Sequence, residues 1–225
     1  MKFQHLPRAA AFAAALGFVL TFATTKAPAA PLAPARVAEL CANADGQAHC
    51  GRLIETEQLQ ALPNLAVRDG DTLRVSLFPA GVREFIDVDT IRGSQTYSLW
   101  DYWGPLNAVV LFTTNLDRTG YALLQRVTGQ MTALPGEPVL APDRQRLAIA
   151  DFCAHDCAND VSVWRITREG VRRESAWKPR EPWTDVTVSW KDATMLAIEH
   201  TLSDGKTLTL ERRLSDPVWT RFDAR

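Results

Sequence analysis

The stretch RLAIADFCAHDCANDVSVWRIT, residues 146–167, decides the fold expected of this chain. Two apolar runs, 146–152 and 160–167, lie on either side of a polar loop that contains two cysteines. Each run has the length and composition of a β-strand, and the loop is short enough for the two strands to pair. We therefore expect an antiparallel hairpin with the cysteines at its tip.

Runs of the same kind continue in both directions along the chain. Residues that favour turns, mainly Gly, Pro and Asp, separate these runs. Short strands spaced by turn signals are typical of an antiparallel all-β domain. We expect an antiparallel meander of about eleven short strands over residues 71–225, with a β-sandwich as the alternative. Besides the hairpin, the expected strands are 73–78, 83–91, 97–103, 107–114, 121–128, 171–178, 184–190, 195–201 and 206–214.

The sequence also contains an internal similarity. The segments VLAPDRQRLAI (139–149) and VSWKDATMLAI (188–198) share Val, Asp and Leu-Ala-Ile at identical spacing. The runs at 73–78 and 108–114 begin two earlier strand–turn–strand units. Four units of irregular spacing fall in the range of repeat arrays, a class that includes propellers.

One of these units resembles a known kind of repeat. Residues 141–173 are similar to a blade of the WD-repeat and periplasmic Tol-type β-propellers. Ala141-Pro142-Asp143 matches the blade opening, 147–149 the first strand and 161–164 the second, whereas Arg144 replaces the usual Gly. The resemblance implies a propeller-like architecture. It would be minimal or incomplete, because about eleven strands cannot fill four blades of four strands.

The N-terminal residues have the three-part pattern of a secretory signal peptide. Lys2, His5 and Arg8 precede an apolar run without charge, and small residues at 27–29 follow it. We expect a signal peptide at 1–29, with an uncleaved anchor helix as the alternative and a lipoprotein as a weaker one. Residues 30–70 then form a linker and a disulfide-containing segment with a weak helical pattern, before the all-β domain at 71–225.

Compartment and charge narrow the classes of partner. No later segment approaches about twenty apolar residues, so we expect a periplasmic or secreted protein without membrane insertion after signal cleavage. The formal net charge of −1 and the absence of basic runs exclude the electrostatic surface that nucleic-acid binding requires. A protein or a glycan is the expected partner, and a homodimer remains open.

The four cysteines, Cys41, Cys50, Cys153 and Cys157, are an even number in an exported chain, which favours disulfides. The pairs Cys41–Cys50 and Cys153–Cys157 are favoured because each is close in sequence, but crossed pairing stays open. A zinc site with His155 is an alternative for the 153–157 loop, although its C-x3-C spacing differs from the usual C-x2-C. A redox-active cysteine pair is a further alternative, but its usual spacing is also C-x2-C. We expect no metal and no cofactor.

Two groups of residues are candidates for ligand binding. A disulfide would hold His155, Asp156 and Asp160 in a fixed pose on the loop, and rigid loops often carry binding residues. Trp100, Tyr102 and Trp103 crowd one strand, and part of this patch is expected to be a contact surface. The simpler interpretations are a solvated hairpin tip for the loop and core packing for the aromatics.

The leading functional hypothesis is an exported binding or interaction module. The sequence lacks the G-x-S-x-G, H-E-x-x-H and G-x-G-x-x-G motifs, and we assign no catalytic residue. One alternative is a hydrolase or lyase that acts on an envelope glycan or polymer through carboxylates, because such residues leave no local motif. Its candidates are Asp87, Asp89, Asp101 and Asp160. Another alternative is a metal-binding envelope protein that uses His49, His155 and the cysteines.

Overall fold

The computed structural model describes residues 32–90, 93–116 and 118–222, so the signal peptide expected at 1–29 lies outside the described residues. Two helices, α1 (Pro34–Cys41) and α2 (Gln47–Ala61), precede the strands. In the described part of the chain, no helix is long and apolar enough to cross a membrane.

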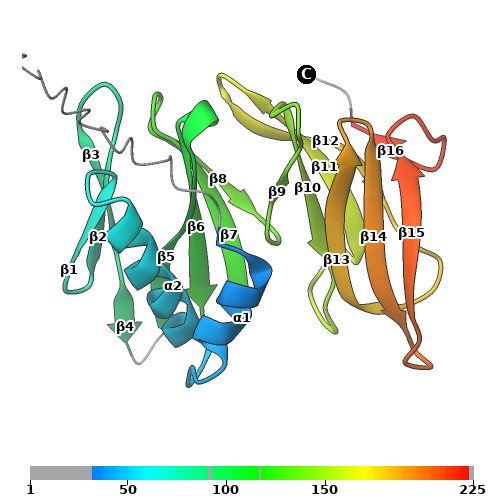
Figure 1. Cartoon of the computed structure of the whole chain (residues 1–225), viewed down its shortest axis with the longest axis horizontal. Coiled ribbons are helices and arrows are strands. Elements are labelled where there is room, and N and C mark those ends of the chain that lie inside the picture. Colours follow the sequence, from blue (N-terminus) through cyan, green and yellow to red (C-terminus); the bar gives the residue numbers. More distant parts are fainter. Residues whose placement is uncertain (1–31, 91–92, 117, 223–225) are drawn as a thin grey trace, which may run out of the picture.

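The strands form four antiparallel sheets that follow one another along the chain (Figure 1). The first sheet contains β1 (Ala66–Asp69), β2 (Thr72–Ser76) and β3 (Val82–Ile86). The second contains β4 (Val88–Thr90), β5 (Gly93–Trp103), β6 (Ala108–Asn115), β7 (Arg118–Gln125) and β8 (Gln130–Leu134). The third contains β9 (Val139–Leu140), β10 (Arg146–Asp151), β11 (Asp160–Thr167) and β12 (Gly170–Trp177), with β16 (Thr220–Arg221) paired to β12. The fourth contains β13 (Trp183–Asp192), β14 (Met195–Leu202) and β15 (Thr207–Arg213).

This architecture confirms the expected antiparallel all-β fold. The hairpin expected at 146–167 is β10 and β11, whose pairing runs from Arg146 opposite Arg165 to Asp151 opposite Asp160. The sheets lie side by side in a row in Figure 1, and none of the described sheets closes on itself. Propeller-like closure therefore stays a prediction. Several strands were not expected from the sequence, namely β1, β8, β9 and β16, and each has at most five residues.

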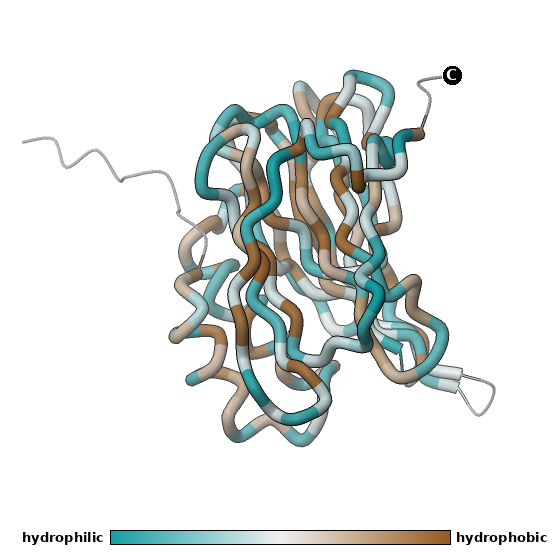
Figure 2. Tube along the Cα trace, turned by 90° about the vertical axis from the view of Figure 1, so that its right-hand side faces the viewer, coloured by the Kyte–Doolittle hydropathy of each residue, from teal (hydrophilic) through white to brown (hydrophobic). Residues whose placement is uncertain are grey.

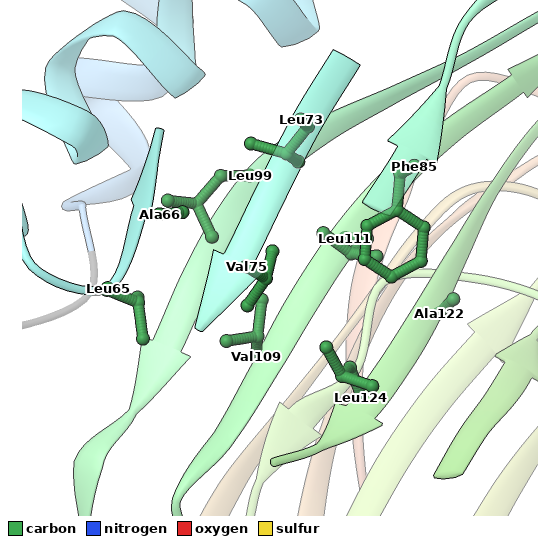
Figure 3. Close-up of a cluster of buried hydrophobic side chains, with 10 residues drawn as sticks. All are labelled: Leu65, Ala66, Leu73, Val75, Phe85, Leu99, Val109, Leu111, Ala122 and Leu124. Carbon is green, nitrogen blue, oxygen red and sulfur yellow. The ribbon is translucent and has the colours of Figure 1, made fainter. Parts of the chain in front are cut away.

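Three hydrophobic layers hold the four sheets together. In the first layer, side chains of β2 such as Leu73 and Val75 face Val109 and Leu111 of β6, and Phe85 lies beside them (Figure 3). The second layer joins the second and third sheets through residues such as Val110, Leu123, Leu147 and Ile149. The third layer joins the third and fourth sheets and includes Val161, Val163, Leu196 and Ile198.

The position of a sheet in this row explains the hydrophobic pattern of its strands. The second and third sheets are covered on both faces, and accordingly residues 108–112 of β6 and 147–149 of β10 are buried without interruption. Strands of the outer sheets have one face in solvent, and in β15 exposed and half-buried residues alternate. Figure 2, which looks onto the side of the fourth sheet, shows teal and brown alternating along the strands.

Helix α2 covers a free edge of the second sheet. Strand β4 pairs only with residues 93–95 of β5, so the following backbone groups of β5 lack a neighbouring strand. Gln58 donates to the Trp100 carbonyl at 2.8 Å, and Glu55 accepts from the Leu99 amide at 2.9 Å. Buried backbone groups need such partners, and an unpaired edge invites association with other chains. The helix therefore completes the sheet with side chains in place of a strand.

A buried ion network fixes this helix. The guanidinium of Arg68 donates to both oxygens of Glu55 at 2.8 Å, and Arg52 donates to Glu55 at 3.0 Å. Asp87 forms ion pairs with both arginines and accepts from the Tyr97 amide at 2.9 Å. Asp87, a candidate catalytic carboxylate, is thus enclosed between helix and sheet and holds the two together.

Candidate binding groove

Both disulfides have the favoured pairing, Cys41–Cys50 and Cys153–Cys157, with Cα atoms 4.7 Å and 5.5 Å apart. Disulfides persist in oxidising compartments, so these bonds indicate an extracytoplasmic environment. Metal binding by cysteine requires the thiolate. The metal-binding alternative therefore loses its sulfur ligands. Among the described residues, no group of three or more His, Cys, Asp and Glu side chains could hold a metal ion.

Hydrogen bonds inside the 152–160 loop hold its backbone in place. Asp151 accepts from the Ala158 amide at 2.9 Å, and Asn159 accepts from the Cys153 amide at 3.2 Å. The loop is therefore closed by polar contacts as well as by the disulfide.

The three loop residues predicted to bind a ligand have different positions. His155 and Asp156 are exposed, and Asp156 forms an ion pair with Arg118 at the start of β7. Asp160 is buried, with an exposed fraction of 8%, and pairs with Arg173 of β12. Asp160 is the first residue of β11, and its carboxylate accepts from Arg173 on the neighbouring strand. Asp160 thus belongs to the sheet and not to the exposed tip.

The structure places the aromatic residues of 100–103 at different depths. Trp103 is 6% exposed and belongs to the second hydrophobic layer, and Tyr102 packs against the first layer. Trp100 packs on Phe112 and Tyr121, with ring centroids 5.3 Å and 5.4 Å away. We expected one face of this strand to meet solvent, but the second sheet lies between two other sheets. Trp103 is therefore a core residue, whereas Trp100 and Tyr102 are half-buried, and a contact surface at this run stays a prediction.

Two further candidate carboxylates differ in their surroundings. Asp101 accepts from the Tyr102 amide at 2.7 Å and from the Trp103 indole at 2.8 Å. Burial raises the pKa of Asp101 above its ordinary value, although both hydrogen bonds oppose the shift. Burial also raises the pKa of Glu137, and the nearby charge of Asp101 adds to this effect. Asp89, in contrast, is exposed.

The disulfide loop forms one wall of a groove of about 700 Å³. This wall consists of Phe152, Cys153, Ala154 and Asn159, and residues 178–185 form the other wall. The second wall is the connection between β12 and β13, so the groove lies where the third and fourth sheets meet. Figure 1 shows these two sheets next to each other.

Trp183 is the aromatic centre of this groove. Its ring stacks on His200 of β14 at 3.7 Å with an interplanar angle of 19°, and Phe152 lies 6.0 Å away. Trp177 meets it edge to face at 5.3 Å. His200 itself is only 4% exposed. Because the buried His200 stacks on the indole and Trp177 packs against it, these neighbours hold the orientation of the Trp183 ring.

The indole N–H groups also distinguish this region. Five of the seven tryptophans donate their indole N–H to an acceptor in the protein. Within the described residues, the indole N–H groups of Trp177 and Trp183 have no such acceptor. Both side chains are half-buried and line hollows in the surface. A tryptophan with a free N–H at a groove can bond a ligand as well as stack on it.

Sequence reasoning gave neither of these two tryptophans a binding role and so missed the groove. The available signal was the segment WKPREPW, residues 177–183. Two prolines cannot donate to a sheet ladder, so the charged residues between the tryptophans must lie in an extended connection. Aromatic residues at both ends of a charged, proline-containing connection indicate a surface site better than the aromatic run at 100–103 does.

Comparison with known proteins adds no relative. No protein-family model matches the sequence, and the search of curated proteins gives no match. Fold and site therefore define only the class, an antiparallel all-β protein with two disulfides. Within that class, this chain is distinguished by the groove between its disulfide loop and residues 178–185.

Proposed function

We propose that this protein is an exported binding module that captures a glycan in the groove between the disulfide loop and residues 178–185. The observation that carries the proposal is Trp183, whose ring is backed by His200 and whose N–H has no acceptor in the described protein. Pyranose rings present an apolar face of C–H groups that stacks on an indole. Their hydroxyl groups need polar partners at the rim of the same site.

The groove supplies such partners. Asn159 from the disulfide loop and Thr184 and Asp185 from the opposite wall all line it, together with the backbone of the 178–182 connection. Ligand sites commonly combine an apolar or aromatic surface with a few polar groups that set orientation. The disulfide supports this arrangement because it holds one wall in place, which lowers the entropy lost on binding.

The compartment fits this role. An N-terminal signal pattern and two disulfides support export to the periplasm or secretion from the cell. Glycans of the envelope or of the surroundings are accessible in either place.

The test is binding of the exported protein to an array of neutral and charged oligosaccharides. We expect binding by the wild type and a loss of at least about tenfold for Trp183→Ala, because central aromatic anchors dominate binding energy. Asn159→Ala is a second groove variant that leaves the aromatic cluster intact and should also weaken binding. Thr187→Ala is the matched control, since Thr187 is an exposed residue of β13 that does not line the groove. Absence of glycan binding by the wild type would overturn the proposal.

A carboxylate-dependent hydrolase or lyase is the second candidate function. The favouring observation is that Asp101 and Glu137 lie near each other among aromatic side chains, with the pKa of each raised by burial. A general acid must hold its proton near neutral pH, and burial is the usual means. Release of reducing sugar from envelope polysaccharide by the wild type, and its loss in Asp101→Asn, would support this function.

A further inference from the structure

A second hollow lies beside the proposed glycan groove. It has a volume of about 600 Å³ and shares residues 178–181 and Trp183 with the groove. Its remaining lining residues include Trp177, Arg212 and Val218. A ligand in the groove that extends past the 178–182 connection would therefore enter this hollow.

The charge of this hollow is unbalanced. Three basic residues, Lys178, Arg180 and Arg212, line it together with one acidic residue, Glu181. Within the described residues, none of the three basic side chains has a carboxylate at ion-pair distance. Elsewhere in this structure arginines are commonly paired, for example Arg146 and Arg165 with Glu174. Three unpaired cations around one hollow attract an anion.

Arg212 occupies the most constrained position of the three. It lies on β15 opposite Leu196, on the face that includes Leu208 and Leu210 and is directed toward the third sheet. Its guanidinium carbon lies 4.8 Å from the centre of the Trp177 ring. Its Nε atom is buried and has no hydrogen-bond partner among the described residues. A buried donor without an acceptor is unfavourable, so the protein leaves the charged group of Arg212 incompletely satisfied.

We propose that the captured glycan is acidic, and that Arg212 binds a carboxylate on one of its sugars while Trp183 stacks on the chain. This inference rests on the proposed function and names its ligand class. A guanidinium presents two parallel N–H groups that match the two oxygens of a carboxylate. Trp177 lies against that guanidinium, and the flexible side chains of Lys178 and Arg180 add positive charge at the rim.

The test compares two ligands that differ only in charge. Isothermal titration with oligogalacturonate and with the same oligomer as its methyl ester keeps the sugar backbone constant and removes the carboxylate charge. We expect the wild type to bind the acid at least about tenfold more tightly than the ester, with an affinity that falls as salt is raised. Equal affinity for the two oligomers would overturn the acidic-ligand inference.

Variants of the basic residues make the test specific. Arg212→Gln should abolish the preference for the acid, and Arg212→Lys should retain only part of it, because lysine keeps the charge but loses the paired donors. Arg180→Gln should weaken binding of the acid severalfold, and since Arg180 is exposed its removal does not disturb packing. Arg213→Gln is the matched control, because its side chain is exposed on the opposite face of β15. An unchanged preference for the acid in Arg212→Gln would overturn the inference.

Other outcomes separate this inference from the proposed function. Binding of a neutral glycan, with no affinity for oligogalacturonate or its ester, would overturn the acidic ligand and leave the binding module standing. Equal affinity for dextran sulfate and oligogalacturonate would indicate ion exchange at a basic surface and would overturn the carboxylate assignment. Absence of binding to any glycan would overturn both proposals.

Discussion

Replacement of Glu55 by alanine should destabilise the protein strongly, because this carboxylate is the centre of the buried network beneath α2. Glu55 is 2% exposed and accepts hydrogen bonds from Arg52, from Arg68 through both oxygens, and from the Leu99 amide. Removal of one member of a buried ion pair typically costs about 3–5 kcal/mol. Asp87 still pairs with both arginines, so we expect the lower end, about 3 kcal/mol.

The assay is reversible urea unfolding, supported by thermal unfolding followed by circular dichroism. For a chain of this size, a loss of about 3 kcal/mol corresponds to a decrease in Tm of about 6–12 °C. Glu57→Ala is the matched control on the same helix, since Glu57 pairs with Arg36 near the surface and such pairs contribute little. A loss of less than about 1 kcal/mol for Glu55→Ala, or equal effects of the two variants, would refute the assigned role of this network.

Three other predictions concern packing, pH and the disulfide loop. In Gly51→Ala, the new Cβ would lie 2.8 Å from a ring carbon of Phe112. Because the cost of this overpacking exceeds the gain in helix propensity, the variant should be about 1–2 kcal/mol less stable in urea unfolding. An unchanged unfolding midpoint would contradict this packing. Burial alone would raise the pKa of Glu174, but hydrogen bonds from two arginines outweigh it and hold the pKa below its ordinary value of 4.5. The stability that Glu174 contributes is therefore present at neutral pH and lost as the pH falls below that value. Glu174→Gln should be less stable than wild type at pH 7, and the difference in stability should shrink in acid. A difference that does not depend on pH would exclude this role of Glu174. Replacement of Cys153 and Cys157 by alanine should lower the free energy of unfolding by about 2 kcal/mol, because the closed loop is short. It should also weaken glycan binding, because it loosens one wall of the groove. Full binding by the double variant would mean that the loop needs no disulfide to hold its pose.

Much of the secondary structure could be predicted because it depends on neighbouring residues. The hairpin 146–167 has two apolar strands and a loop whose cysteines are close enough to bond, and the structure contains both features. The weak helical pattern expected in the 30–70 segment, at 53–62, coincides with the second half of α2, which ends at Ala61. Short edge strands such as β9, with two residues, escaped prediction because their conformation is stabilised by the strand they pair with.

The sites could not be predicted in the same way, because each depends on segments distant in the sequence. The aromatic run at 100–103 gave an expectation that part of it is a contact surface, and the packing of the third sheet against the second buries Trp103 while Trp100 and Tyr102 stay half-buried. Glu55 and Arg68 have no special context in sequence, yet the fold brings them together at the edge of β5.

The sequence by itself determined the fold class and the positions of most strands, and it favoured the two local cysteine pairs, because periodicity, turn residues and short loops act over a few neighbours. The tertiary structure alone decided which faces of the strands are covered, which carboxylates are buried, and that Trp183 meets Phe152 across the groove. The physical reason is that burial is shared between surfaces contributed by different sheets. The exposure of a residue depends on which other residues pack against it, and only the assembled row of sheets determines those contacts.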